Sequence, residues 1–150
     1  MGRPVVRLKD IADKTGFSVN TVSLALRGSP RIPEETTRLI RDAAQSLNYL
    51  PNHVAKSLVS RETKTVGLVL TDITNPALTQ VAQSIELALA ERGYSTLFAT
   101  SNNDLEEERR VIAMFQSRRV DGMLIYPRNH RDLDHIRALR RANYPVVLLV

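Results

Sequence analysis

The segment from Ser18 to Arg27 combines side chains that suit the base edges of a nucleic acid. A helical wheel places Val22 inward and leaves Asn20, Leu24 and Arg27 pointing away from it. A side-chain amide can form two hydrogen bonds with adenine, and an apolar side chain can contact the thymine methyl group. The residues expected to contact bases are therefore Val19, Asn20 and Leu24.

Polar and basic side chains in and after this segment suit phosphate groups. Hydroxyls, cationic side chains and the free amides of a helix N-terminus all donate hydrogen bonds to phosphate oxygens. The residues expected to contact phosphates are Ser18, Thr21, Ser23, Arg27, Asn52 and Lys56. From these residues alone, an ordinary pair of packed helices remains the alternative.

The distribution of charge favours a polyanionic partner. The chain has 150 residues and a formal net charge of +5. Residues 1–65 hold eleven basic and six acidic side chains, which gives +5, whereas residues 66–150 hold ten of each. A basic segment joined to a neutral one suggests that only the first part binds an anionic polymer. A solvated basic surface is the alternative explanation.

Several function classes find no support in the sequence. There is no cysteine, which removes disulfides and thiolate metal ligands, and the three histidines have no metal-ligand spacing. The glycine pattern of dinucleotide-binding turns and the phosphate-binding lysine loop are both missing after the first predicted strand. No apolar run approaches the ~20 residues of a membrane span, and no signal peptide is visible. The lack of cysteine is compatible with a reducing cytoplasm, and we expect a non-enzymatic protein without metal or cofactor.

The first 50 residues are predicted to form a three-helix unit. Apolar spacing indicates helices near residues 8–15, 18–27 and 34–47, and Thr15-Gly16-Phe17 forms the turn between the first two. Two short helices joined by such a turn are typical of a helix-turn-helix. We expect a DNA-binding headpiece at 1–50.

From residue 65 the pattern alternates between strands and helices, which indicates an α/β Rossmann-like parallel sheet with helices on both faces. Strands are expected at 65–70, 94–100, 120–126 and 145–150, and helices at 77–92, 104–119 and 131–143. Ligands of such sheets lie at the carboxyl ends of the strands. The candidate effector-binding residues there are Asp72, Asn75, Ala77, Leu78 and Arg128, with Ser101 and Asn102 close by. Polar side chains of this kind suit a hydroxylated small molecule, although each also suits a capped helix or an ordinary loop.

Residues 51–64 join the two parts. Asn52 can cap a short helix over 52–59 in which Val54 and Leu58 share one face and Lys56 faces phosphate or groove. A plain linker with an apolar anchor is the alternative. Because the chain stops at Val150, directly after an apolar strand, we expect the natural protein to continue.

The order of motifs along the chain resembles the LacI/GalR family of bacterial transcription regulators. The residues that carry the likeness are the segment 8–28, Gly28-Ser29-Pro30-Arg31-Ile32-Pro33-Glu34-Glu35-Thr36, residues 47–58, Thr65-Val66-Gly67-Leu68-Val69, Asp72-Ile73-Thr74-Asn75-Pro76 and Arg118-Arg119-Val120-Asp121-Gly122. The resemblance implies a helix-turn-helix headpiece, a hinge helix, and the first, incomplete subdomain of a periplasmic-binding-protein-type core at 65–150. It also implies a ligand-responsive repressor in the bacterial cytoplasm, associated with the nucleoid.

The resemblance further implies the partners and the roles of two hinge residues. A homodimer would bind a pseudo-palindromic double-stranded DNA operator and a small-molecule effector such as a sugar or nucleoside. Leu58 matches the leucine that wedges into the minor groove and kinks the duplex. Val54 matches the residue that packs one hinge helix against the other.

Three positions depart from the family pattern. Arg7 replaces a frequent threonine cap, Leu24 replaces a frequent polar base-reading residue, and Ala77-Leu78 replaces an aromatic pair. Two other classes remain as alternatives from the residues: a Rossmann-like enzyme with an incidental basic arm, and an architectural protein that bends DNA without sequence preference.

Overall fold

The computed structural model describes residues 5–51 and 62–150. The chain divides into two compact units, Met1–Asn52 and His53–Val150, here called the headpiece unit and the α/β unit. The expectations for Asn52, Val54, Lys56 and Leu58 fall outside the described residues.

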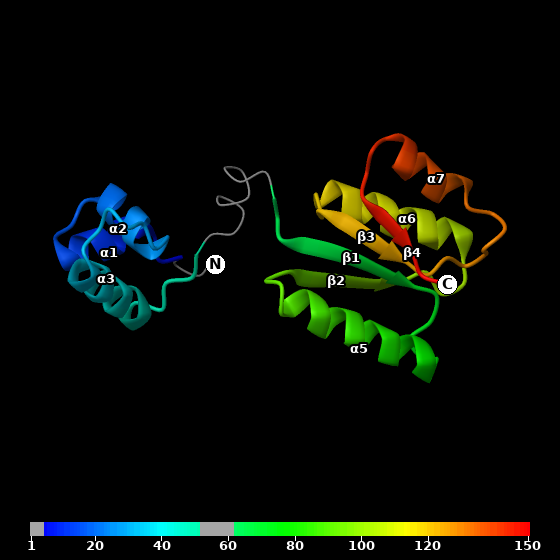
Figure 1. Ribbon diagram of the computed structural model, residues 1–150, viewed down its shortest axis with the longest axis horizontal. Coiled ribbons are helices and arrows are strands. Elements are labelled where there is room, and N and C mark those ends of the chain that lie inside the picture. Colours follow the sequence, from blue (N-terminus) through cyan, green and yellow to red (C-terminus); the bar gives the residue numbers. More distant parts are fainter. Residues whose placement is uncertain (1–4, 52–61) are drawn as a thin grey trace. The chain divides into compact units, whose positions relative to one another are not determined.

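The headpiece unit consists of α1 (Leu8–Thr15), α2 (Val19–Leu26) and α3 (Glu34–Ser46) (Figure 1). One side chain or more from every helix enters a common apolar core. The buried members of that core are Ile11, Ala12, Val22, Ala25, Ile40, Ala43 and Ala44. The expected three-helix arrangement is confirmed.

The turn between α1 and α2 follows from Gly16 and Ser18. Gly16 adopts a left-handed conformation with φ of 76°, and its amide donates to the Ala12 carbonyl at 2.8 Å. Ser18 then caps α2, since its Oγ accepts from the Thr21 amide at 3.1 Å. These two residues end one helix and begin the next within three positions.

The start of α1 has only part of a capping arrangement, as the replacement of threonine by Arg7 predicted. A guanidinium cannot accept a hydrogen bond, and no side-chain cap forms at Arg7. Asp10 partly compensates, because its Oδ2 accepts from the Arg7 amide at 2.6 Å. This contact is the carboxylate half of a capping box.

The α/β unit is a parallel sheet with strand order β2-β1-β3-β4. Its strands are β1 (Thr65–Leu70), β2 (Ser95–Thr100), β3 (Gly122–Ile125) and β4 (Val146–Leu148). Helix α5 (Pro76–Ala90) packs on one face, whereas α6 (Leu105–Ser117) and α7 (Asp134–Arg141) cover the other (Figure 1). All three helices run against the strand direction, so their C-terminal ends meet at the edge where the strands begin.

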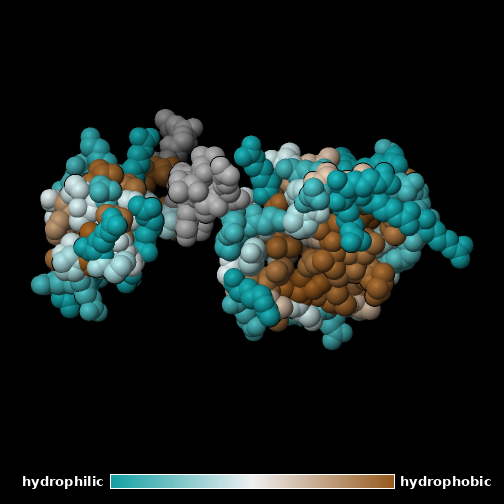
Figure 2. Space-filling model, turned by 45° about the horizontal axis from the view of Figure 1, so that its top comes forward, coloured by the Kyte–Doolittle hydropathy of each residue, from teal (hydrophilic) through white to brown (hydrophobic). Residues whose placement is uncertain are grey.

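Gly67 lets α6 lie close to the centre of the sheet. A Cβ at this position would approach the Phe115 ring to 2.4 Å, which is too close for any side chain. Phe115 itself is fully buried. The face of the sheet that α5 packs against is less completely covered. Figure 2 shows a broad apolar surface on this unit. The side chains of Phe98 and Val147 remain 43% and 55% exposed.

Helix α1 and strand β1 have the predicted bounds, whereas several later elements are shorter than the sequence pattern predicted. The third strand begins at Gly122 instead of residue 120, because the Val120 amide still bonds back to the Phe115 carbonyl at the end of α6. The last helix begins at Asp134 instead of residue 131. Before it, Asn129 accepts from the Arg131 amide at 2.9 Å and so forms a turn.

Candidate nucleic-acid interface and effector site

The outer face of α2 presents the residues expected to contact bases. Val22 and Ala25 are fully buried in the headpiece core, which fixes the rotation of the helix. Val19 is 45% exposed, and Asn20 is also exposed. Leu24 is half-buried, yet it is not part of the apolar core cluster. An amide and two apolar groups therefore share an accessible helix face, the combination that adenine and thymine recognition requires.

Two of the expected phosphate donors are already bonded to each other. Ser18 Oγ and Thr21 Oγ1 lie 2.9 Å apart, and either can be the donor. Since one hydroxyl hydrogen is used in this bond, only the other remains for a phosphate. Arg27 is exposed at the far end of α2, and its Nε donates to the carbonyl of half-buried Ser23 at 3.2 Å.

The basic residues of the headpiece unit are solvent-exposed. No ion pair forms among residues 5–51. The exposed cations in this range are Arg7, Lys9, Lys14, Arg27, Arg31, Arg38 and Arg41. They are consequently available to a polyanion.

Polar groups at the carboxyl end of β1 are engaged in local turns. Asp72 Oδ1 accepts from the Thr74 amide at 2.7 Å, and the Thr74 hydroxyl also donates to this carboxylate. These bonds, the backbone one first, lower the pKa of Asp72 from its usual value. Asn75 caps α5 by accepting from the Ala77 amide at 3.0 Å, and its side-chain NH₂ has no hydrogen-bond partner among the described residues.

The remaining expected effector residues differ in accessibility. Ala77 and Arg128 are exposed. Leu78 is 9% exposed and packs with Leu68 and Leu70, an arrangement that accounts for it as a core residue. Ser101 is fully buried at the end of β2, and its hydroxyl has no partner among the described residues.

Glu108 is a buried anchor that the sequence reasoning missed. It is 1% exposed; its Oε2 accepts from the Arg128 amide at 2.7 Å, and its Oε1 lies 2.6 Å from His135 Nε2. The carboxylate thus connects α6, α7 and the loop that carries Arg128. Helical spacing could have revealed it, because Glu108 shares the face of Val111, Ile112 and Phe115.

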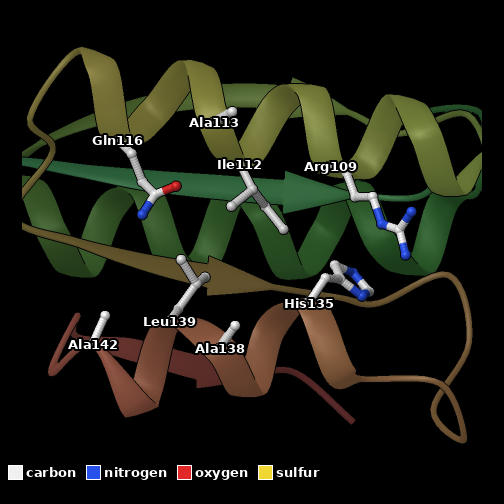
Figure 3. A pocket seen from close by; sticks show the side chains of 8 residues that line it. All are labelled: Arg109, Ile112, Ala113, Gln116, His135, Ala138, Leu139 and Ala142. Carbon is white, nitrogen blue, oxygen red and sulfur yellow. The ribbon is translucent and has the colours of Figure 1, made fainter.

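A shallow groove lies between α6 and α7. Figure 3 shows it with Arg109 and His135 at one end and Ile112 and Leu139 near its middle; the lining residues are Arg109, Ile112, Ala113, Gln116, His135, Ala138, Leu139 and Ala142. None of the expected effector residues lines this groove. Its walls are mostly apolar, so it lacks the convergent polar groups that orient a hydroxylated ligand.

Asp121 is a second anchor that the sequence reasoning missed. Its carboxylate accepts from the Thr63 amide and hydroxyl at 2.7 and 2.9 Å, and from the Lys64 amide at 2.8 Å. The residues that lead into β1 are thereby fixed to the start of β3.

Two negative observations hold for residues 5–51 and 62–150. Within them, no three His, Asp or Glu side chains gather in a way that could hold a metal ion. None of their helices is long and apolar enough to cross a membrane.

Comparison with known families matches both units. Residues 7–52 match the profile described as bacterial regulatory proteins, lacI family. Residues 63–150 match the profile described as periplasmic binding proteins and sugar binding domain of LacI family.

Curated relatives include repressors of sugar operons. The ribose operon repressor of Bacillus subtilis is 39% identical over 142 residues, which cover 95% of this chain and 42% of that protein. The sucrose operon repressor of Lactococcus lactis is 35% identical, with 88% of this chain and 42% of that protein covered. The chain spans about two fifths of the length of these relatives.

A crystal structure of the Lac repressor dimer bound to operator and the anti-inducer ONPF has a TM-score of 0.83 and 25% identity, and the match covers 96% of this chain and 44% of the repressor. A LacI-family regulator from Silicibacter pomeroyi has a TM-score of 0.81 and 26% identity, over 95% and 43% of the two chains. With both units matched in order, the chain belongs to the LacI family of bacterial regulatory proteins.

Proposed function

We propose that the protein is a ligand-responsive transcriptional repressor that binds a pseudo-palindromic operator as a homodimer. The observation that carries the proposal is that Val19 and Asn20 are exposed on the outer face of α2. The orientation of this helix is fixed by the buried side chains of Val22 and Ala25. Relatives that match both units are repressors, and a structural neighbour is a dimer bound to operator. Action on chromosomal DNA in the bacterial cytoplasm and the absence of catalysis are parts of this proposal.

The headpiece at 1–50 would supply sequence recognition. Val19, Asn20 and Leu24 would contact base edges, and the hydroxyls of Ser18, Thr21 and Ser23 would contact phosphates together with Arg27. In the hinge at 51–64, the family resemblance supports phosphate contacts by Asn52 and Lys56, a minor-groove wedge at Leu58 and a dimer contact at Val54.

The α/β unit at 65–150 would supply half of an effector site at the carboxyl ends of its strands. Asp72, Asn75, Ala77 and Arg128 are the residues that support this placement, and Leu78 would shape the floor from within the core. Relatives named for ribose and sucrose operons support a sugar as the class of effector.

The test is sequence-specific binding by the 150-residue chain. A 20-base-pair duplex selected by the chain from a random library is compared with a scrambled duplex at one fixed salt concentration. Asn20→Ala is expected to lose about 1–3 kcal/mol on the selected duplex and much less on the scrambled one, because one bidentate base interaction disappears.

Lys56→Ala is the matched comparison, since removing a phosphate-binding side chain weakens both duplexes alike. Equal losses on both duplexes for Asn20→Ala would remove Asn20 from base recognition. A wild-type chain with no preference for the selected duplex would overturn the proposed function.

A further inference from the structure

Residues 62–150 of the α/β unit hold eleven basic and eleven acidic side chains, but these charges are divided between the two edges of the sheet. We call the edge where the strands begin the basic edge. It is defined by Lys64, Arg92, Arg118, Arg119, Arg140 and Arg141. The acidic residues at the same edge are Glu62, Glu91 and Asp121. The opposite edge, with the first turns of α6 and α7, holds most of the remaining acidic residues of the unit.

Four guanidinium groups of the basic edge are uncompensated. Arg118, Arg119, Arg140 and Arg141 are exposed, and none makes an ion pair or a side-chain hydrogen bond with any residue in 5–51 or 62–150. Asp121, the acidic side chain next to Arg119 and Val120, is already occupied by the Thr63 and Lys64 amides.

Arginines nearer the opposite edge behave differently. Arg109 pairs with Glu106 at 2.9 Å, Arg110 pairs with Glu107, and Arg137 pairs with Asp134 at 3.2 Å. Among the described residues, the arginines without a carboxylate partner are therefore more numerous at the basic edge, where α6 and α7 end, than at the opposite edge, where Arg128 and Arg131 also lack one.

Compensation of the helix dipoles does not account for all four groups. Cations near a helix C-terminus contribute about 0.3–1 kcal/mol each, and the effect is confined to the last turn. Here each of two adjacent helices ends in a pair of arginines, whose mutual repulsion opposes that gain. Arg119, just after α6, has a φ of 55°, a backbone conformation in which glycine or asparagine is favoured. The equivalent positions after α5 and α7 are indeed occupied by Gly93 and Asn143.

The basic edge is also where the chain arrives from the headpiece unit. β1 begins at Thr65, and Asp121 fixes Thr63 and Lys64 to this edge. The fourteen residues 51–64 can span at most roughly 48 Å when fully extended. Once the headpiece is bound to a duplex, the tether therefore keeps this edge at high local concentration near the same duplex.

We propose that the basic edge is a second DNA-contact surface, which binds phosphates of the duplex flanking the headpiece site through Arg118, Arg119, Arg140 and Arg141. This inference rests on the proposed function of the headpiece. Guanidinium groups match phosphate geometry, and such contacts are independent of base sequence. The surface adds affinity and salt dependence without adding specificity.

The test uses the 150-residue chain and the quadruple variant Arg118→Gln/Arg119→Gln/Arg140→Gln/Arg141→Gln. The matched control neutralises the same number of arginines on the other side: Arg109→Gln/Arg110→Gln/Arg131→Gln/Arg137→Gln. Affinity is measured against salt on two duplexes, a 40-base-pair duplex with the selected site at its centre and the 20-base-pair site alone. Circular dichroism confirms folding of each variant, and Arg118→Gln/Arg140→Gln replaces the quadruple variant if the latter does not fold.

On the long duplex, the quadruple variant is expected to bind at least tenfold more weakly near 50 mM salt. The slope of log affinity against log salt should become shallower by about 0.9 for each phosphate that the variant no longer neutralises. On the short duplex its affinity should change less, and the control should match the wild type on both duplexes.

The inference would be overturned if the quadruple variant bound the long duplex with the same affinity and the same salt dependence as the wild type. If poly-glutamate binding then depended on the same four arginines, the surface would instead serve an acidic protein segment. A wild-type chain that does not distinguish the selected site from the scrambled duplex would contradict the proposed function itself, so the two failures are distinguishable.

Discussion

Glu108 Oε1 and His135 Nε2 lie 2.6 Å apart inside the α/β unit, although nothing in their sequence separation of 27 residues suggests a pair. The other oxygen of the same carboxylate holds the Arg128 amide. His135 Nδ1 is buried without a partner among the described residues. One carboxylate therefore organises the loop after β3.

Glu108→Ala should lower the free energy of unfolding of the α/β unit by about 2–6 kcal/mol, because it leaves a buried imidazole and a backbone amide unsatisfied, at about 1–3 kcal/mol each. Glu108→Gln should cost about 1–3 kcal/mol, since its carbonyl can still accept from one of the two donors. Urea unfolding with hydrogen exchange of the Arg128 amide measures both effects. Glu107→Gln, at an exposed pair with Arg110, is the control and should change little. Equal stability of Glu107→Gln and Glu108→Ala would contradict the anchoring role.

Gly67→Ala should destabilise the α/β unit by about 1–3 kcal/mol, because the new Cβ would overlap the Phe115 ring. Phe115→Leu replaces the ring with a smaller aliphatic side chain and should relieve the overlap. A double-mutant cycle measured by urea unfolding should therefore give a double variant more stable than the sum of the single effects predicts. Strict additivity would show that the two residues are not in close contact.

Ser18→Ala should lower the free energy of unfolding of the headpiece unit by about 1 kcal/mol, because the Thr21 amide loses its cap. Hydrogen exchange of the amides in 8–46 reports this loss without interference from the α/β unit. Ser23→Ala is the control in the same helix, where alanine is the better helix former. Similar protection in both variants would show that Ser18 does not stabilise α2.

The fold could be predicted from the sequence because the turn and cap residues agree with the spacing of the apolar residues. Gly16 and Ser18 mark the turn of the helix-turn-helix, and the uninterrupted apolar strand 65–70 marks the first strand of a covered parallel sheet. Element ends were less predictable, because they depend on single hydrogen bonds such as that from Val120 to Phe115.

The α2 surface could likewise be predicted, because one helix determines which way Asn20 points. Helical spacing places Glu108 on the buried face of α6, but the partners of Glu108 and of Asp121 could not be predicted in the same way. Each joins segments distant in sequence, and a carboxylate near a helix N-terminus or before a strand has many local explanations. Their partners emerge only when the sheet brings β3, α6 and α7 together.

The last prediction concerns the pKa of Asp72 at the expected effector edge. The Thr74 backbone amide and then its hydroxyl stabilise the charged carboxylate, so the pKa lies below the ordinary value near 3.8. A depressed pKa means that the turn contributes stability above the unfolded value and loses it as pH falls through the folded value.

Thr74→Val removes the hydroxyl donor but keeps the amide, and should raise the pKa of Asp72 part of the way toward 3.8. Carbon-detected NMR titration of the Asp72 carboxyl measures the shift, and Thr79→Val, whose hydroxyl bonds only backbone carbonyls, is the control. An unchanged pKa in Thr74→Val would mean that the backbone amide alone holds the charge.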